Sequence, residues 1–206
     1  MSELTNVMKQ RRSIRKYKPH PIPAESLRRL VEIASYAPSA HNAQPWRFVV
    51  IISQNQKDAL ADEMAQIWLK VLEGEHVTKS MRWKTVQASV KRFTTAPALV
   101  VCCLTMENMD NYPDTERQKN ERDLAVQSLA AAIQNLLLAA HCEGLGACWF
   151  CAPVFCKEAV RKVLKIPRSV EPQALITIGY SAEKPKPPKR LPLDVFAFLD
   201  SYGNPL

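Results

Sequence analysis

The residues from 97 to 104 (Pro-Ala-Leu-Val-Val-Cys-Cys-Leu) form a nearly continuous apolar run. Runs of this kind, without polar alternation, are typical of strands at the centre of a sheet, where both faces are covered. We therefore predict a central strand at 97–104. A chain of 206 residues is long enough for one well-buried core and short for two, so the other elements are expected to pack around this strand.

Strands and helices alternate along the rest of the chain. The segment 46–52 (Trp-Arg-Phe-Val-Val-Ile-Ile) is rich in aromatic and β-branched residues and predicts a second strand. The longest helix is predicted from Arg122 to Cys142; it is apolar almost all round and so belongs in a core or a subunit interface. The remaining predictions are helices at 4–10, from Ala24 up to Pro38, at 55–72, in the second half of 74–92 and at 157–164, short strands at 147–150 and 173–178, and a polar loop at 106–118.

The net charge of +8 comes from the two ends of the chain. Residues 9–18 hold six lysines and arginines and no acid, with Ser13 among the arginines, and residues 184–190 hold four more beside Glu183. Arginine forks match phosphate oxygens and a serine hydroxyl adds a donor, so both clusters together could hold a terminal phosphate. The alternative is a solvated basic face. Nucleic acid is disfavoured, because the charge is local and interleaved aromatic residues are missing.

Composition indicates a soluble protein, with 47% apolar and 23% charged residues. No uninterrupted apolar run approaches the ~20 residues that a membrane helix needs. The residues after Met1 are polar and then basic, without the apolar centre of a signal peptide. We therefore expect a cytoplasmic protein with neither a membrane nor a nucleic-acid partner.

No sequence motif supplies a phosphate loop or a catalytic nucleophile. The sole Gly-x-Gly, at 144–146, follows a predicted helix, so neither a Rossmann nor a Walker loop is present. None of the four histidines has a partner at metal spacing, and His41 is expected to be a surface or pocket-wall residue. An enzyme of this kind would need a cofactor to supply its chemistry.

The cysteines are also compatible with a different class of protein. An iron–sulfur or zinc protein could use the spacing C-x5-C-x2-C-x4-C, formed by Cys142, Cys148, Cys151 and Cys156. Against this, no second Cys-x-x-Cys completes a compact site, and alternation along a strand would turn Cys148 and Cys151 to opposite faces. The prediction is therefore that no metal is bound, with the cysteine cluster as the alternative.

Two motifs resemble those of the nitroreductase family of FMN-dependent oxidoreductases. They are 11–17 (Arg-Arg-Ser-Ile-Arg-Lys-Tyr) and 37–48 (Ala-Pro-Ser-Ala-His-Asn-Ala-Gln-Pro-Trp-Arg-Phe). Further matches lie at 96–101, 144–146, 178–180 and 189–192, so the resemblance spans nearly the whole chain. The order and spacing of the first two motifs are specific to this family.

The resemblance implies an α+β fold, a nitroreductase-like three-layer α/β/α sandwich around a mixed, mainly antiparallel sheet. It implies one FMN-binding domain over 1–206, in an intertwined homodimer with FMN at the interface. Residues 181–206 would form an arm exchanged with the partner subunit. Three prolines among residues 184–189 hold this arm extended, which suits an exchange.

The resemblance also implies the cofactor-binding residues, which are Arg11, Arg12, Ser13, Arg15, Ser39, Asn42, Gln44, Phe150, Cys151, Ala152, Lys189 and Arg190. The first segment would contact the phosphate, the ribityl chain and the N1/O2 edge of the ring, where Arg15 would stabilise reduced flavin. Lys189 and Arg190 would complete the phosphate site. The loop 39–44 would reach the flavin from the partner's side, and the backbone of 150–152 would lie along the ring.

The implied reaction has two steps at flavin N5, with hydride passing from NADH or NADPH to the flavin and then to a small electron-poor acceptor such as a nitroaromatic compound or a quinone. Residues 147–155 are unlike a typical bacterial nitroreductase and closer to the flavin domain of deazaflavin-coenzyme maturation enzymes. A deazaflavin coenzyme or its dehydro precursor is therefore the alternative substrate. Many members contact the pyrimidine ring through an Asn or Lys after the third helix, and 74–92 offers no identifiable match.

Overall fold

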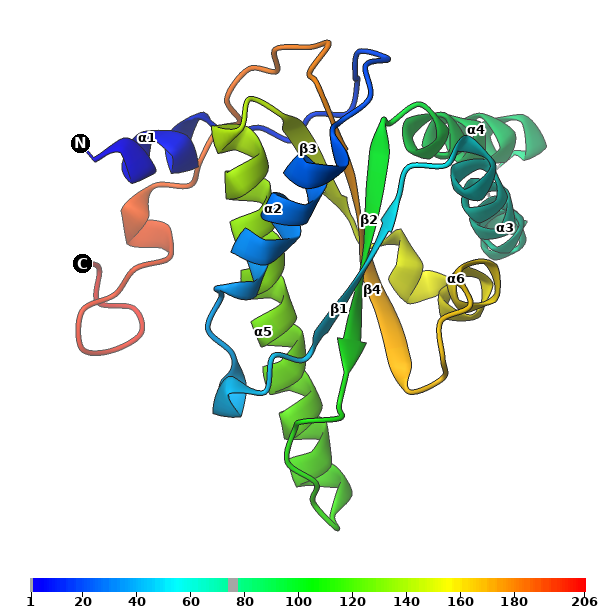
Figure 1. The fold of residues 1–206 in the computed structure, drawn as a ribbon. Helices are drawn as coiled ribbons and strands as arrows, with labels where there is room; N and C mark the ends of the chain where they lie inside the picture. The colour runs from blue at the N-terminus through cyan, green and yellow to red at the C-terminus, as the bar shows by residue number, and fades with distance from the viewer. Residues whose placement is uncertain (1, 74–77) are drawn as a thin grey trace.

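A four-stranded antiparallel sheet lies at the centre of the protein (Figure 1). A computed structural model describes residues 2–73 and 78–206. The sheet order is β1-β2-β4-β3, and the strands are Trp46–Ile51 (β1), Ala98–Thr105 (β2), Gly146–Phe150 (β3) and Val170–Gly179 (β4). Every residue of β2 is buried, which confirms the prediction of a central strand covered on both faces.

Helices cover both faces of the sheet (Figure 1). One layer holds α2 (Ala24–Ser35) and α5 (Thr115–Cys142), and the other holds α3 (Gln54–Glu73), α4 (Lys79–Thr94) and α6 (Lys157–Leu164). Side chains alternate along β2, so Val100 packs with the first layer and Val101 with the second. This three-layer α/β/α arrangement is the expected fold class. The short elements are α1 (Glu3–Gln10) and the 3-10 helices η1 (Ala40–Asn42), η2 (Ala152–Phe155) and η3 (Leu193–Val195).

The helix α5 begins at Thr115, seven residues before the predicted start, so the loop prediction was wrong over 115–118. Asp114 explains the difference, because its carboxylate accepts a hydrogen bond from the backbone N–H of Arg117 at 2.8 Å. A side chain that caps a free N–H in this way starts a helix within polar sequence. By length and composition alone α5 could cross a membrane, but half of its most apolar window is buried inside the protein, as in a core helix.

Among the other elements, β4 and α4 also begin before their predicted starts. The strand β4 begins at Val170 rather than at residue 173, because its first residues continue the pairing with β2 beyond a bulge at Cys102 and Cys103. The helix predicted in the second half of 74–92 is α4, which Thr78 caps by accepting from the N–H of Met81. Residues 74–77 lie outside the described residues.

Residues 13–17 extend the sheet beyond β3. Ser13 forms a parallel bridge with Ala147, and Tyr17 forms an antiparallel bridge with Ser181 just after β4. The parallel contact makes the extended sheet mixed and mainly antiparallel, as expected. The first basic motif is therefore part of the sheet and takes its position from β3.

The C-terminal arm, residues 181–206, leaves the sheet and turns back past α1 (Figure 1). Its large apolar side chains are exposed at Leu191, Leu193, Val195, Phe196, Leu199, Tyr202 and Leu206. Within the described part of one chain, these side chains have no apolar surface that buries them. Exposed apolar groups gathered on one segment are typical of a surface that contacts another protein.

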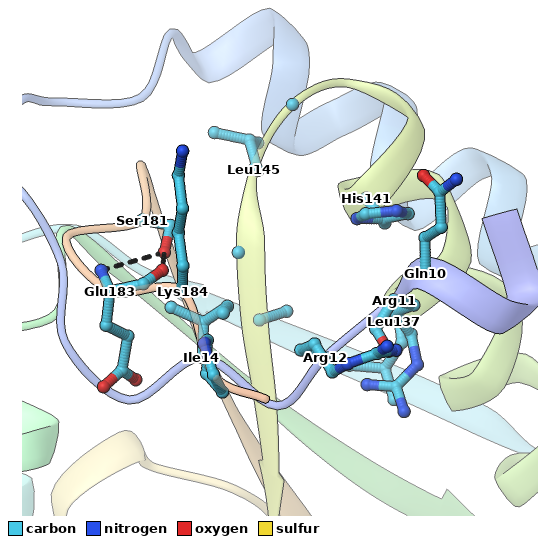
Figure 2. A pocket seen from close by; sticks show the side chains of 14 residues that line it. Gln10, Arg11, Arg12, Ile14, Leu137, His141, Leu145, Ser181, Glu183 and Lys184 are labelled. Carbon is cyan, nitrogen blue, oxygen red and sulfur yellow. Dashed lines mark hydrogen bonds between the residues drawn. The ribbon is translucent and has the colours of Figure 1, made fainter. Parts of the chain in front are cut away.

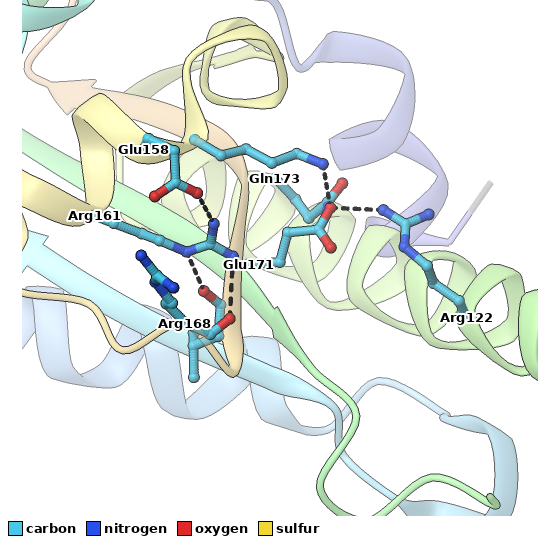
Figure 3. A network of polar contacts seen from close by, with 8 residues as sticks. Arg122, Glu158, Arg161, Arg168, Glu171 and Gln173 are labelled. Atoms are coloured by element: carbon cyan, nitrogen blue, oxygen red, sulfur yellow. Dashed lines mark hydrogen bonds and ion pairs between the residues drawn. The ribbon is translucent and has the colours of Figure 1, made fainter.

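Glu171, at the start of β4, ties both helical layers to the sheet (Figure 3). Its Oε1 accepts hydrogen bonds from Arg122 of α5 at 2.6 Å and from Lys157 of α6 at 2.5 Å. Burial acts to raise the pKa of Glu171, but the hydrogen bonds from Lys157 and Arg122 outweigh it, so the pKa lies below its ordinary value. The folded protein therefore favours the ionised carboxylate.

We expect Glu171→Gln to lower the free energy of unfolding by about 1 kcal/mol at pH 7, because an amide cannot neutralise Lys157 and Arg122 and the site is partly exposed. The contribution of a carboxylate with a depressed pKa is present above the unfolded-state pKa of about 4.3 and is lost as the pH falls through the folded-state pKa. Urea unfolding of both proteins between pH 7 and pH 3 should show the difference shrinking. A difference in the free energy of unfolding that stays constant over this pH range would contradict the role of Glu171. Glu158→Gln is the control, because Glu158 forms an ion pair with Arg161 at the surface.

Candidate functional site

The thiol of Cys148 in β3 lies within reach of the positive charge of several basic side chains. Burial raises the pKa of Cys148, while the positive charges of Arg15, Arg92 and Arg11 and a hydrogen bond with Ser13 act in the opposite direction. Three of these residues come from the first basic motif and Arg92 comes from α4. Positive charge that acts on one point of β3 from two segments, beside a hydroxyl, favours an anionic ligand there.

A cavity of about 430 Å³ opens on the same face of β3, beside Arg92. Its walls are mostly apolar, and they are formed by Met64, Ile67, Trp68 and Val71 of α3, Ser89, Arg92 and Phe93 of α4, and Phe150, Cys151, Ala152, Phe155 and Cys156. The rings of Phe93 and Phe150 pack edge to face, with centroids 5.3 Å apart. An apolar cavity of this size next to a few polar groups is the usual form of a small-molecule site.

A second cavity, of about 400 Å³, lies on the opposite face, against α5 (Figure 2). Basic residues from both ends of the chain line it: Figure 2 shows Arg11 and Arg12 beside His141 on one side of β3, and Lys184 on the other. Burial and the charges of Arg11 and Arg12 lower the pKa of His141. Arg12 donates to the carbonyl oxygens of Lys9 and Arg11 at 2.6 and 2.8 Å. Arg11 and Arg12 therefore both line this second cavity, and only the charge of Arg11 also acts on Cys148.

A close approach between Ile14 and Gly146 holds the basic segment against β3. A Cβ at Gly146 would lie 2.7 Å from the Cβ of Ile14, nearer than side chains can stand. The N–H of Ile14 donates to the carbonyl oxygen of Ala147 at 3.0 Å. Only glycine leaves room for this contact, so Gly146 is a packing residue as well as part of the turn after α5.

Tyr17 anchors the far end of the same segment. Its hydroxyl donates to the carbonyl oxygen of Ile14 and lies 2.6 Å from Oγ1 of Thr177. Burial raises the pKa of Tyr17, so the hydroxyl keeps its proton. Glu183 fastens the segment to the arm, because its Oε1 accepts from the backbone N–H of Arg15 at 2.6 Å.

The loop that carries Ser39, Asn42 and Gln44 lies at the other end of the sheet from the basic segment (Figure 1). Oγ of Ser39 accepts from the N–H of Gln44 at 3.1 Å. Asn42 and Gln44 both have positive φ, at 50° and 48°, which is uncommon outside glycine. In one chain these three predicted residues therefore do not meet Arg11, Ser13 or Arg15.

The remaining predicted residues fall into two groups. Phe150, Cys151 and Ala152 line the apolar cavity, whereas Lys189 and Arg190 lie exposed on the arm. The cysteines are free thiols, with Cys148 and Cys156 buried and Cys142 and Cys151 exposed. Over residues 2–73 and 78–206, no three of them come close enough to hold a metal.

Arg92 is the site residue that sequence analysis missed. It falls within 74–92, where no flavin contact could be identified. Val86, Ser89 and Phe93 are buried on α4, and this spacing gives the face of the helix that turns toward the sheet. That spacing is the signal that could have placed Arg92, which borders the same face.

A mixed sheet between two helical layers, with a cationic segment fixed along its edge, defines a protein of the nitroreductase fold. The chain belongs to the nitroreductase family: residues 8–180 match the family model described as "Nitroreductase family". The resemblance drawn from the two sequence motifs is thereby confirmed.

Similar proteins of known sequence or structure support membership of this family. The chain is 30% identical over 192 residues to YfhC of Bacillus subtilis (strain 168), which is named as an NAD(P)H nitroreductase, covering 93% of this chain and 91% of YfhC. It is also similar to a BluB-like flavoprotein from Clostridium difficile 630, at a TM-score of 0.79 and 26% identity over 98% of this chain and 100% of that one. A nitroreductase from Desulfovibrio desulfuricans, solved in complex with FMN, matches at a TM-score of 0.74 and 26% identity over 98% and 99% of the two chains.

We expect Gly146→Ala to push residues 11–15 away from β3 and to weaken binding at the Cys148 face by about tenfold or more, because the added methyl group overlaps Ile14. The measurement is a fluorescence titration with FMN as the anionic probe, beside thermal unfolding. Ile14→Gly combined with Gly146→Ala removes the overlapping atoms of Ile14 and should recover part of the lost affinity. Equal affinity in the wild type and Gly146→Ala would show that this contact does not position the site.

Proposed function

We propose that the protein is an FMN-dependent oxidoreductase that uses NADH or NADPH to reduce a small electron-poor acceptor, as a cytoplasmic homodimer. The observation that carries this proposal is the position of Ser13, which hydrogen-bonds Cys148 where the charges of Arg11, Arg15 and Arg92 also act, beside the cavity lined by 150–152. The FMN complex of one structural relative and the NAD(P)H nitroreductase name of another support it. When bound, FMN would supply hydride transfer at its N5 atom.

The residues of the site fit the shape and charge of this cofactor. Arg11 and Ser13 would hold the phosphate and ribityl end with charge-assisted hydrogen bonds, joined by Lys189 and Arg190 of a seated arm. Arg15 and Arg92, both of which act on Cys148, would face the pyrimidine edge of the ring. Fixed positive charge there favours the negative charge that this edge gains on reduction. The cationic groups thus match the phosphate and the pyrimidine edge of FMN.

The apolar cavity would serve the acceptor. Its aromatic side chains, Phe93 and Phe150 among them, would exclude water and favour flat, poorly solvated molecules over charged ones. The protein contributes binding, orientation and electrostatics here, because the proposed reaction needs no nucleophilic side chain. Nitroaromatic compounds and quinones are acceptors of this shape.

A partner subunit would complete the site. The loop that carries Ser39, Asn42 and Gln44 lies at the other end of the sheet from the segment that carries Arg15 (Figure 1). The exposed apolar side chains of 181–206 call for a covering surface. An intertwined dimer with exchanged arms would explain both the position of the loop and the exposed arm. It would bury the arms and bring the loop 39–44 of one chain over the site of the other.

The direct test is the absorption spectrum of freshly purified protein. We expect a yellow protein with the two visible bands of an oxidised flavin, bleached by NADH or NADPH and restored by an electron-poor acceptor. Reduced deazaflavin, tested in parallel, distinguishes the alternative reductant. A colourless protein that does not take up added FMN would refute the proposal.

Arg11 and Arg15 should differ in what they recognise. We expect Arg11→Ala to weaken FMN binding by about 10- to 100-fold with little effect on riboflavin, because a charge-assisted phosphate contact contributes roughly 1.5–3 kcal/mol. Arg15→Ala should weaken both ligands alike, since it faces the ring, and should lower the midpoint potential of bound FMN. Fluorescence titrations with both flavins measure this, with Arg28→Ala, an exposed arginine on α2, as the charge-matched control. Equal losses for both flavins in Arg11→Ala would remove that residue from the phosphate site.

A further inference from the structure

Three potential metal ligands meet at the end of the molecule that carries η1. Nε2 of His41, Oδ2 of Asp110 and Oε1 of Glu121 all lie within 4.8 Å of one another. Nε2 of His41 is 3.3 Å from Oε1 of Glu121 and 3.9 Å from Oδ2 of Asp110. His41 belongs to η1, Asp110 to the loop that follows β2, and Glu121 to α5, so the fold assembles this group from three separate segments.

The carboxylate of Glu121 is the feature of this group that indicates a bound cation. Only 5% of this residue is exposed. Its Oε1 meets His41, but its Oε2 is buried and has no hydrogen-bond partner among the described residues. A buried carboxylate with one oxygen unpaired is costly, and a cation beside it removes that cost. The unpaired oxygen is an observation independent of the clustering, and it also indicates a missing positive charge.

We propose that His41, Asp110 and Glu121 bind a divalent transition-metal cation, with zinc as the best fit. Imidazole nitrogen and carboxylate oxygen are both zinc ligands, at about 2.0–2.2 Å from the metal. Tetrahedral geometry at that radius sets ligand atoms about 3.3 Å apart, which the observed spacings approach before any side chain rotates. Three protein ligands leave the fourth position to water. His41 and Asp110 are exposed, so the cation can enter from solvent.

The site would fasten the loop 39–44 to α5. Besides the His41–Glu121 contact, the N–H of Ala40 already donates to Oγ of Ser128 on α5 at 3.1 Å. His41 has a positive φ of 54°, a strained conformation for a residue with a side chain. A metal ligated by His41 and Glu121 would compensate that strain and fix the loop. The proposal concerns the folded chain itself and is independent of the proposed flavin chemistry.

The test is isothermal titration of the full-length protein with Zn²⁺ after chelator treatment and dialysis. We expect one zinc per chain and a zinc-dependent rise in the thermal unfolding midpoint. Glu121→Gln, which keeps the shape of the side chain, and His41→Ala should each weaken zinc binding by about tenfold or more and abolish the rise. His20→Ala, an exposed histidine elsewhere, should behave as the wild type. Zinc affinity unchanged in Glu121→Gln and His41→Ala would overturn the proposal.

Two further measurements cover the cases in which a Glu121 variant does not fold or zinc binds to cysteines instead. Asp110→Asn lies at an exposed position, so it preserves the test if substitution of the buried Glu121 prevents folding. Co²⁺ in place of Zn²⁺ reports the ligand type, because the exposed thiols of Cys142 and Cys151 would give an intense thiolate-to-cobalt band. A spectrum without that band supports the His41 site, and a thiolate band at one metal per chain would refute it.

Discussion

The contact between residues 11–17 and the edge of β3 is the constraint on which the functional part of the structure depends. Gly146 lets Ile14 approach the strand, and the Tyr17 hydroxyl ties the segment to Ile14 and Thr177 of β4. A flexible basic peptide would place its charges anywhere around the surface. Once the peptide becomes part of the sheet, each side chain takes a fixed face, and a cluster of like charges becomes a defined binding site.

The basic residues of that segment serve two different surroundings. Ser13 hydrogen-bonds Cys148, and the charges of Arg15 and of Arg92 on α4 both act on that thiol. Arg12 belongs to the opposite cavity, against α5. Keeping three guanidinium groups near one another costs electrostatic energy unless an anion is bound. The apolar cavity beside them holds little charge of its own, so the site combines an electrostatic end with a hydrophobic end, which is the division that a phosphorylated aromatic cofactor requires.

One chain leaves several features without a partner. The arm exposes apolar side chains from Leu191 to Leu206, and the loop 39–44 carries its polar residues away from the basic segment. Both features have the same physical explanation in a dimer, because one subunit would supply what the other exposes. Glu121 of α5 contacts His41 of that loop, so this contact helps to set where the loop lies.

The sequence by itself determined the central strand through its apolar run and the family through two local motifs, and the resemblance to that family implied the layers; run and motifs depend on neighbouring residues only. The buried β2, the helix Lys157–Leu164 and the strand at 46–51 follow directly from that local pattern. Only the tertiary structure decided that Arg92 joins Arg15, that Gly146 makes room for Ile14, and that His41 meets Asp110 and Glu121. These contacts join residues far apart along the chain, and the packing of helices against the sheet, which no local pattern encodes, brings them together.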